Sequence, residues 1–124
     1  MKAILFVDDH EVLARLSCQI LQAHGYRAEC AYNAREALAK FERGNFDMLI
    51  TDYRMEEMNG LELARIVRQK VPDLPVIIVT GYPHEDASDE VSAWMDKHDL
   101  FPALLDKISL CLGERESQEA MRSA

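Results

Sequence analysis

The sequence lacks a long hydrophobic run and an excess of basic residues. No stretch approaches the roughly 18 consecutive apolar residues that a membrane-spanning helix requires. The apolar run at 3–7 is also too short for a secretory signal peptide. The formal net charge is −8 at pH 7, whereas a domain that binds nucleic acid requires a basic face. We therefore expect a cytoplasmic protein that binds neither a membrane nor nucleic acid directly.

The sequence also lacks closely spaced cysteines and the common phosphate-binding motifs. Its three cysteines, Cys18, Cys30 and Cys111, form no C-x-x-C motif and no zinc-type cluster with histidine. We expect them to be reduced thiols in or near the core. No P-loop, no G-x-G-x-x-G motif and no G-x-S-x-G nucleophile motif occurs. These absences disfavour zinc sites, the usual nucleotide-binding loops and serine-hydrolase chemistry.

Apolar runs alternate along the chain with helical patterns. The length of 124 residues suits one domain, which we place at 1–113 with a polar tail at 114–124. We expect strands at 3–7, 26–31, 46–51, 76–79 and 91–95, and helices at 10–24, 33–44, 59–71 and 101–112. This alternation predicts an α/β fold, a flavodoxin-like five-stranded parallel sheet of order 2-1-3-4-5 with helices on both faces.

Apolar side chains recur on one side of each expected helix. In the first helix we expect the sheet-facing residues to be Val12, Leu13, Leu16 and Ile20. In the last helix the corresponding residues are Phe101, Leu104, Leu105, Ile108 and Leu112. Between Thr80 and Lys97 only Ala87 and Val91 could face a core. The sequence therefore predicts a loop or about one helical turn there, so the fourth helix is shortened or missing.

Polar residues follow four of the five expected strands. Asp8 and Asp9 follow the first strand, Asp52 the third, Thr80 the fourth and Lys97 the fifth. In a parallel sheet these ends meet at one edge, where ligands bind. Two carboxylates about 5 Å apart repel by roughly 3 kcal/mol, which a divalent cation would remove. Oxygen ligands suit Mg²⁺, and the ammonium and hydroxyl groups suit a phosphoryl group.

Other interpretations of these acids remain open. Asp9 could be the N-cap of the first helix, and Asp52 could begin a turn. A Mg²⁺-dependent phosphatase is a further alternative, but such enzymes usually place their two acids two positions apart, whereas Asp8 and Asp9 are adjacent. A flavin-binding domain would need a hydroxyl- or glycine-rich loop after the first strand, where this chain has Asp-Asp-His-Glu.

Together these segments resemble the receiver domains of bacterial response regulators, chemotaxis regulators included. The resemblance runs from Lys2 to about Leu112. It rests on the acidic pair after the first strand and on residues 49–55, Leu-Ile-Thr-Asp-Tyr-Arg-Met, with a glycine eight positions after the aspartate. Residues 76–81, Val-Ile-Ile-Val-Thr-Gly, and 94–97, Trp-Met-Asp-Lys, match the remaining family segments. The combination of these segments is specific to the family, although each segment alone is weak evidence.

The resemblance implies a phosphorylation switch in two-component signalling or a phosphorelay. It implies that Asp52 accepts a phosphoryl group from a histidine kinase or phosphotransfer protein. Thr80 and Lys97 would contact that group, and Trp94 would turn inward when Thr80 moves. Mg²⁺ would be held by three side chains and one backbone carbonyl group, those of Asp8, Asp9, Asp52 and Arg54. Such a protein catalyses only its own phosphorylation and dephosphorylation, and it acts on a downstream protein that the sequence does not name.

Three positions depart from the family pattern. Glu56 and His98 stand where the family usually has proline, and the segment after Thr80 is short by roughly five residues. The family's Lys-Pro bond is usually cis, and a cis bond without proline costs about 3 kcal/mol. We therefore expect the Lys97–His98 bond to be trans. These departures leave a second hypothesis, a degenerate receiver that acts as an unphosphorylated protein-interaction module.

Overall fold

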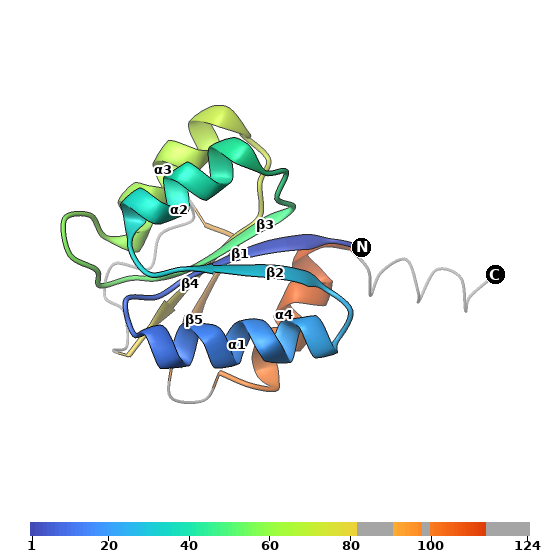
Figure 1. Ribbon diagram of the computed structural model, residues 1–124. Coiled ribbons are helices and arrows are strands. Elements are labelled where there is room, and N and C mark those ends of the chain that lie inside the picture. The colour runs from blue at the N-terminus through green and yellow to red at the C-terminus, as the bar shows by residue number, and fades with distance from the viewer. Residues whose placement is uncertain (82–90, 98–99, 114–124) are drawn as a thin grey trace.

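The computed structural model describes residues 1–81, 91–97 and 100–113. Its strands form one parallel sheet with the order β2-β1-β3-β4-β5. The strands are β1 (Ala3–Val7), β2 (Arg27–Ala31), β3 (Met48–Asp52), β4 (Val76–Thr80) and β5 (Ala93–Asp96). Helices α1 (Glu11–Ala23) and α4 (Ala103–Cys111) cover one face, and α2 (Ala34–Arg43) and α3 (Gly60–Lys70) cover the other (Figure 1). The predicted α/β class, flavodoxin-like strand order and two-sided helix cover are confirmed.

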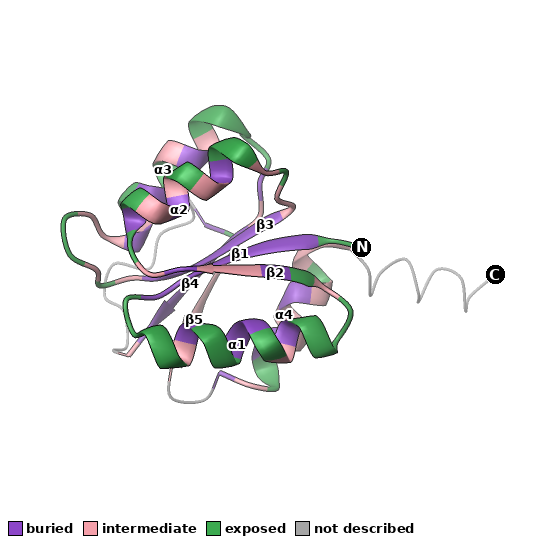
Figure 2. Ribbon diagram, in the orientation of Figure 1, coloured by how far each residue is buried: buried purple, intermediate pink, exposed green. Residues whose placement is uncertain are grey.

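The central strands form because their side chains are apolar on both faces. Every residue of β1, β3 and β4 is buried, as the purple strands in Figure 2 show. This is the pattern of a parallel sheet covered by helices on both sides. One core cluster lies between the sheet and α2 and α3, and a second lies between the sheet and α1 and α4. No helix in the described ranges is long and apolar enough to cross a membrane.

Helix α1 presents a different face to the sheet from the one the sequence predicted. Its buried residues are Ala14, Ser17, Cys18 and Leu21. Val12 and Leu16, which we expected to face the sheet, are 53% and 51% exposed. Leu13 and Ile20, the other two expected residues, are partly buried, so the face that packs on the sheet is rotated from the expected one toward Ala14 and Ser17. In α4 the expected face is confirmed, since Leu104 and Ile108 are buried.

Side-chain caps fix the starts of the first three helices. Asn33 caps α2, and Asn59 forms a reciprocal capping box with Glu62 at the start of α3. The N-cap of α1 is His10, whose Nδ1 accepts a hydrogen bond from the Leu13 N–H at 3.2 Å. The alternative that Asp9 caps this helix is therefore wrong, and its carboxylate is not used in that way.

Several predicted boundaries shift by one or two residues. β3 extends to Asp52, and β5 runs from Ala93 to Asp96 instead of 91–95. Val91 precedes β5 and is buried in the core cluster on the side of α2 and α3. The predicted short or missing helix at 82–90, the trans Lys97–His98 bond and the polar tail at 114–124 lie outside the described residues.

Candidate functional site: a carboxylate cluster at the strand ends

Strand pairing brings the predicted acids together. Val7 of β1 pairs with Thr51 of β3, so the next residues, Asp8 and Asp52, lie side by side at the carboxyl edge of the sheet. Asp9 joins them, and one carboxylate oxygen from each of the three residues lies within 4.8 Å of the others. Asp8 is 2% exposed and Asp52 is 8% exposed, whereas Asp9 is exposed. The cluster therefore has a buried floor and one solvent-facing carboxylate.

Lys97 bridges the two buried carboxylates. Its Nζ lies 3.1 Å from Asp8 Oδ2 and 3.2 Å from Asp52 Oδ2. The lysine follows β5 at the edge of the sheet, so these contacts join the first, third and fifth strands. A buried carboxylate pair requires such a partner because an uncompensated buried charge is costly.

The charges in this cluster do not balance. Burial raises the pKa of Asp52, and the negative charge of Asp8 raises it further, while Lys97 acts in the opposite direction. Burial alone would lower the pKa of Lys97, but the Asp52 and Asp8 carboxylates outweigh that effect and raise it. A single ammonium group thus serves several carboxylates. The cluster can therefore accept further positive charge.

Thr80 and Trp94 lie on the two neighbouring strands. Thr80 is buried at the end of β4, where it pairs in register with Asp96, the residue before Lys97. Trp94 of β5 is partly buried, and its ring centroid lies 5.5 Å from that of Tyr53, which directly follows Asp52. Tyr53 thus links the aromatic residue of β5 to the carboxylate of β3, a contact that the sequence analysis did not identify.

The loop after β3 is held against the acidic strand end. The Gly60 N–H donates a hydrogen bond of 2.7 Å to the Tyr53 carbonyl oxygen. A Cβ atom at position 60 would overlap the carbonyl oxygen of Asp52. Glycine eight residues after the aspartate is therefore required by the close approach of α3 to this strand end. Arg54 lies between them in the exposed part of the loop.

The donor set fits a hard divalent cation. Three carboxylates offer oxygen ligands at one point, and Asp9 keeps that point open to solvent. Mg²⁺ prefers oxygen ligands and retains several waters, so it is suited to a shallow site of this kind. No histidine or cysteine belongs to this group of ligands, which disfavours zinc.

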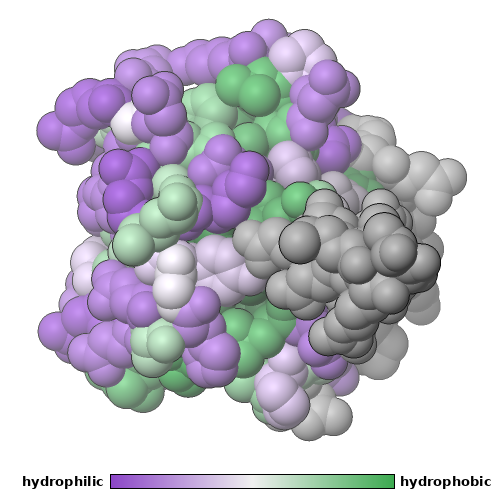
Figure 3. Space-filling view, turned by 90° about the vertical axis from the view of Figure 1, so that its right-hand side faces the viewer, coloured by the Kyte–Doolittle hydropathy of each residue, from purple (hydrophilic) through white to green (hydrophobic). Residues whose placement is uncertain are grey.

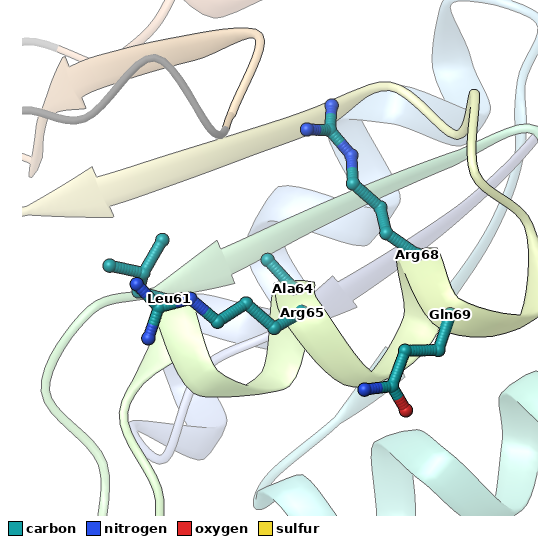
Figure 4. Close-up of a pocket in the computed structure, with 5 residues that line it drawn as sticks. All are labelled: Leu61, Ala64, Arg65, Arg68 and Gln69. Carbon is teal, nitrogen blue, oxygen red and sulfur yellow. The ribbon is translucent and has the colours of Figure 1, made fainter.

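Other concave regions lie away from the carboxylates. A cavity of about 470 Å³ runs along α3, lined by Leu61, Ala64, Arg65, Arg68 and Gln69 (Figure 4). Arg68 extends from it toward β4, where its Nε donates to the Leu74 carbonyl oxygen at 3.1 Å. The amino-terminal end of the sheet shows hydrophilic and hydrophobic residues interspersed (Figure 3). The lining of the cavity along α3 contains no carboxylate.

Comparison with known proteins identifies this arrangement. The family model for the response regulator receiver domain matches residues 4–98. The chain belongs to this family. Membership agrees with the resemblance based on the acidic pair, the segment around Asp52 and the strand ends at Thr80 and Lys97.

Curated receiver proteins resemble the chain over most of its length. It is 34% identical over 113 residues to the transcriptional regulatory protein ZraR of Klebsiella oxytoca, covering 90% of this chain and 25% of ZraR. It is 34% identical over 82 residues to the response regulator receiver protein CpdR of Brucella abortus, covering 66% of this chain and 68% of CpdR. The chain thus spans about a quarter of the length of the first relative and about two thirds of the length of the second.

Solved receiver structures share the fold. The response regulator TrrA of Thermotoga maritima, in complex with Mg²⁺-BeF, superposes with a TM-score of 0.82 and 35% identity over 90% of this chain and 99% of TrrA. A chemotaxis-regulator-like receiver domain protein of Methanospirillum hungatei superposes with a TM-score of 0.85 and 33% identity, covering 95% of this chain and 98% of that protein. A further structure holds TrrA in complex with the histidine kinase ThkA, with a TM-score of 0.80 and 36% identity over 90% and 99%.

Proposed function

We propose that this receiver accepts a phosphoryl group on Asp52 from a histidine kinase or phosphotransfer protein. The observation that carries the proposal is the cluster of three carboxylates within 4.8 Å, with Lys97 bridging Asp8 and Asp52. Family membership and the Mg²⁺-BeF complex of the similar protein TrrA support the same conclusion. The phosphoryl group would then switch a protein-interaction surface.

Each residue of the cluster has a distinct part in this reaction. A carboxylate oxygen of Asp52 attacks the phosphorus atom, and the bond to the donor's histidine nitrogen breaks. The side chains of Asp8, Asp9 and Asp52 and the Arg54 carbonyl group would hold Mg²⁺, which would supply positive charge to offset that of the transferring group. Lys97 would form an ion pair with the phosphoryl oxygens, since its ammonium group already lies 3.2 Å from the Asp52 carboxylate. The Thr80 hydroxyl group would donate a hydrogen bond to another phosphoryl oxygen.

The aromatic contact offers a route from the phosphoryl group to the surface. Movement of Thr80 toward Asp52 would vacate space near β5, and Trp94 would turn into that space. Because the Trp94 ring lies 5.5 Å from the Tyr53 ring, its rotation would change a contact next to the phosphorylated residue. Thr80 and Trp94 therefore form the proposed switch, and a downstream protein would recognise the changed surface around β5.

The outer face of α1 suits contact with the phosphodonor. α1 begins three residues after Asp8, so its first turns flank the carboxylate cluster. Val12 and Leu16, one turn apart, are 53% and 51% exposed on this helix. Exposed apolar side chains beside a reaction site are typical of a protein-interaction surface. We assign this face, Val12 and Leu16, to the histidine kinase or phosphotransfer protein.

The remaining features of the proposal follow from the charge and the site. The net charge of −8 disfavours direct contact with nucleic acid, so the output would pass through a protein. We propose a cytoplasmic location, where histidine kinases present their phosphoryl groups. The chain would catalyse its own phosphorylation and dephosphorylation and no reaction on another substrate. Residues 1–113 would form the receiver and 114–124 a polar tail.

Intact-mass spectrometry tests the proposal directly. The chain is incubated with Mg²⁺ and a small-molecule phosphodonor, in parallel with Asp52→Asn and with a sample containing a metal chelator. We expect one added phosphoryl group, about 80 Da, in the first sample and none in the other two. Absence of the adduct together with absence of Mg²⁺ binding would favour the unphosphorylated interaction module instead.

A further inference from the structure

Two cysteines face each other between α1 and β2. Ala28, Cys30 and Tyr32 occupy alternate positions, so they lie on the same side of the sheet. Ala28 belongs to the core cluster beneath α1, and Cys30 and Tyr32 pack against it. Cys18 projects from α1 into the same cluster and is 4% exposed. α1 lies along β2 (Figure 1), so both side chains enter the same cluster, where Cys30 contributes to the rise in the pKa of the Cys18 thiol.

The two thiols differ in access and in environment. Cys30 is partly exposed on an edge strand, and its Sγ lies 3.3 Å from the Tyr32 hydroxyl group. The Lys40 ammonium donates a hydrogen bond of 2.7 Å to the Cys30 carbonyl oxygen. The Cys30 thiol therefore lies at a partly exposed position among polar groups. Burial, by contrast, raises the pKa of the Cys18 thiol to about 12.

We propose that Cys18 and Cys30 form a redox modification site, in which a hydroperoxide oxidises the pair to an intramolecular disulfide. Cys30 reacts with the peroxide first because it is partly exposed. The buried Cys18 thiol, in the same cluster, then attacks the oxidised Cys30 sulfur. Neither residue belongs to the carboxylate cluster, so the proposal does not depend on phosphorylation of Asp52.

The chemistry balances with hydrogen peroxide as the oxidant. The Cys30 sulfur attacks one peroxide oxygen, the O–O bond breaks, and hydroxide leaves and takes up the thiol proton to form water. The Cys18 sulfur then attacks the resulting sulfenic acid. An S–S bond forms, the S–O bond breaks, and the Cys18 proton leaves with the hydroxyl group as a second water. Two thiols are oxidised, and one peroxide is reduced to two waters.

The disulfide would fasten α1 to the edge strand. It would close a loop that contains the second half of α1 and the turn at Gly25, which restricts the unfolded chain. We therefore expect the oxidised protein to have a higher Tm than the reduced protein. α1 also carries Val12 and Leu16 on its outer side, so the bond would fix the helix that presents this surface.

Peptide mapping of the folded protein tests the proposal. The protein is treated with hydrogen peroxide, blocked with a maleimide under denaturing conditions and digested with trypsin without reduction. We expect residues 16–27 and 28–35 to appear as one linked peptide, about 2 Da lighter than the sum of the two. Residues 108–115, which contain Cys111, should carry the maleimide. Reduction before blocking should restore three labelled thiols.

Two variants separate the pair from the third thiol. Cys30→Ser lies at a partly exposed position and should fold normally, lose the linked peptide and lose the increase in Tm. Cys111→Ser is the matched control and should keep both. Labelling of all three cysteines after peroxide treatment would overturn the proposal. So would a disulfide that includes Cys111, or conversion of Cys30 to sulfinic acid without any linked peptide.

Discussion

At the carboxyl edge of the sheet, charged side chains are buried, whereas on the outer face of α1, next along the chain, apolar side chains are exposed. Asp8 and Asp52 are 2% and 8% exposed, while Val12 and Leu16 are 53% and 51% exposed. Buried carboxylates are unusual in a folded protein, whereas single exposed aliphatic side chains are common. Their consequences for stability differ, because a buried charge costs folding free energy and an exposed aliphatic side chain costs almost none.

This difference predicts how the two regions respond to mutation. Changes at the carboxylate edge should alter stability and chemistry together, since the same charges determine both. Changes on the outer face of α1 should leave stability unchanged and alter only reactions that involve a protein partner. The predictions below test this separation, beginning with the largest expected change in the free energy of unfolding.

Lys97→Met should be the most destabilising of these substitutions. Methionine preserves much of the side-chain volume. It removes the ammonium group, however, which lies 3.1 Å from the Asp8 carboxylate and 3.2 Å from the Asp52 carboxylate. Breaking a buried ion pair typically costs about 3–5 kcal/mol. We expect roughly 2–3 kcal/mol here, because solvent screens the partly exposed lysine. Urea unfolding in metal-free buffer measures the change, and an unaltered midpoint would contradict it.

Mg²⁺ should stabilise the folded protein by a similar amount. A ligand that binds only the folded state at 100 times its Kd adds about 2.7 kcal/mol. Thermal unfolding with and without Mg²⁺ measures the gain. Asp9→Asn is the informative control: Asp9 is exposed, so its substitution should change the metal-free Tm less than Asp52→Asn does, while reducing the gain from Mg²⁺. An equal gain in this variant would remove Asp9 from the proposed ligands.

Asp52→Asn should stabilise the metal-free protein while abolishing phosphorylation. Burial and the charge of Asp8 raise the pKa of Asp52, so the folded state holds this proton more tightly than the unfolded state does. The free energy of unfolding of the wild-type chain should therefore fall relative to that of Asp52→Asn as the pH rises above about 4, the pKa of an aspartate in the unfolded chain. We expect a difference of about 1–2 kcal/mol at neutral pH. A difference independent of pH between 4 and 7 would contradict this explanation.

The sequence predicted the carboxylate edge better than it predicted the faces of the helices. Asp8, Asp52, Thr80 and Lys97 could be located because the carboxyl ends of parallel strands meet at one edge, whatever the details of packing. The core face of α1 could not, because apolar residues occur on two of its sides. Which side packs on the sheet depends on how the side chains fit together, and the spacing of apolar residues along the sequence contains no information on that fit.

The contacts made by the end of β3 and the loop after it could not be predicted from the sequence either. The Tyr53–Trp94 contact joins residues 41 positions apart, and it depends on how the loop after β3 turns. The role of Gly60 could be recognised as a family spacing, but its cause is visible only in the structure, where a Cβ would meet the Asp52 carbonyl oxygen. Both features require the three-dimensional path of the chain.

The smallest expected change in stability belongs to the outer face of α1. Leu16→Ser should alter the free energy of unfolding by less than about 0.5 kcal/mol, whereas Leu21→Ala, on the buried side of the same helix, should cost about 2–5 kcal/mol. With a histidine kinase that phosphorylates the wild-type chain, Leu16→Ser should slow phosphotransfer at least tenfold. Its rate with a small-molecule phosphodonor should stay unchanged, because the carboxylate cluster is intact. Equal slowing with both donors would mean that the residue supports the cluster and does not contact the kinase.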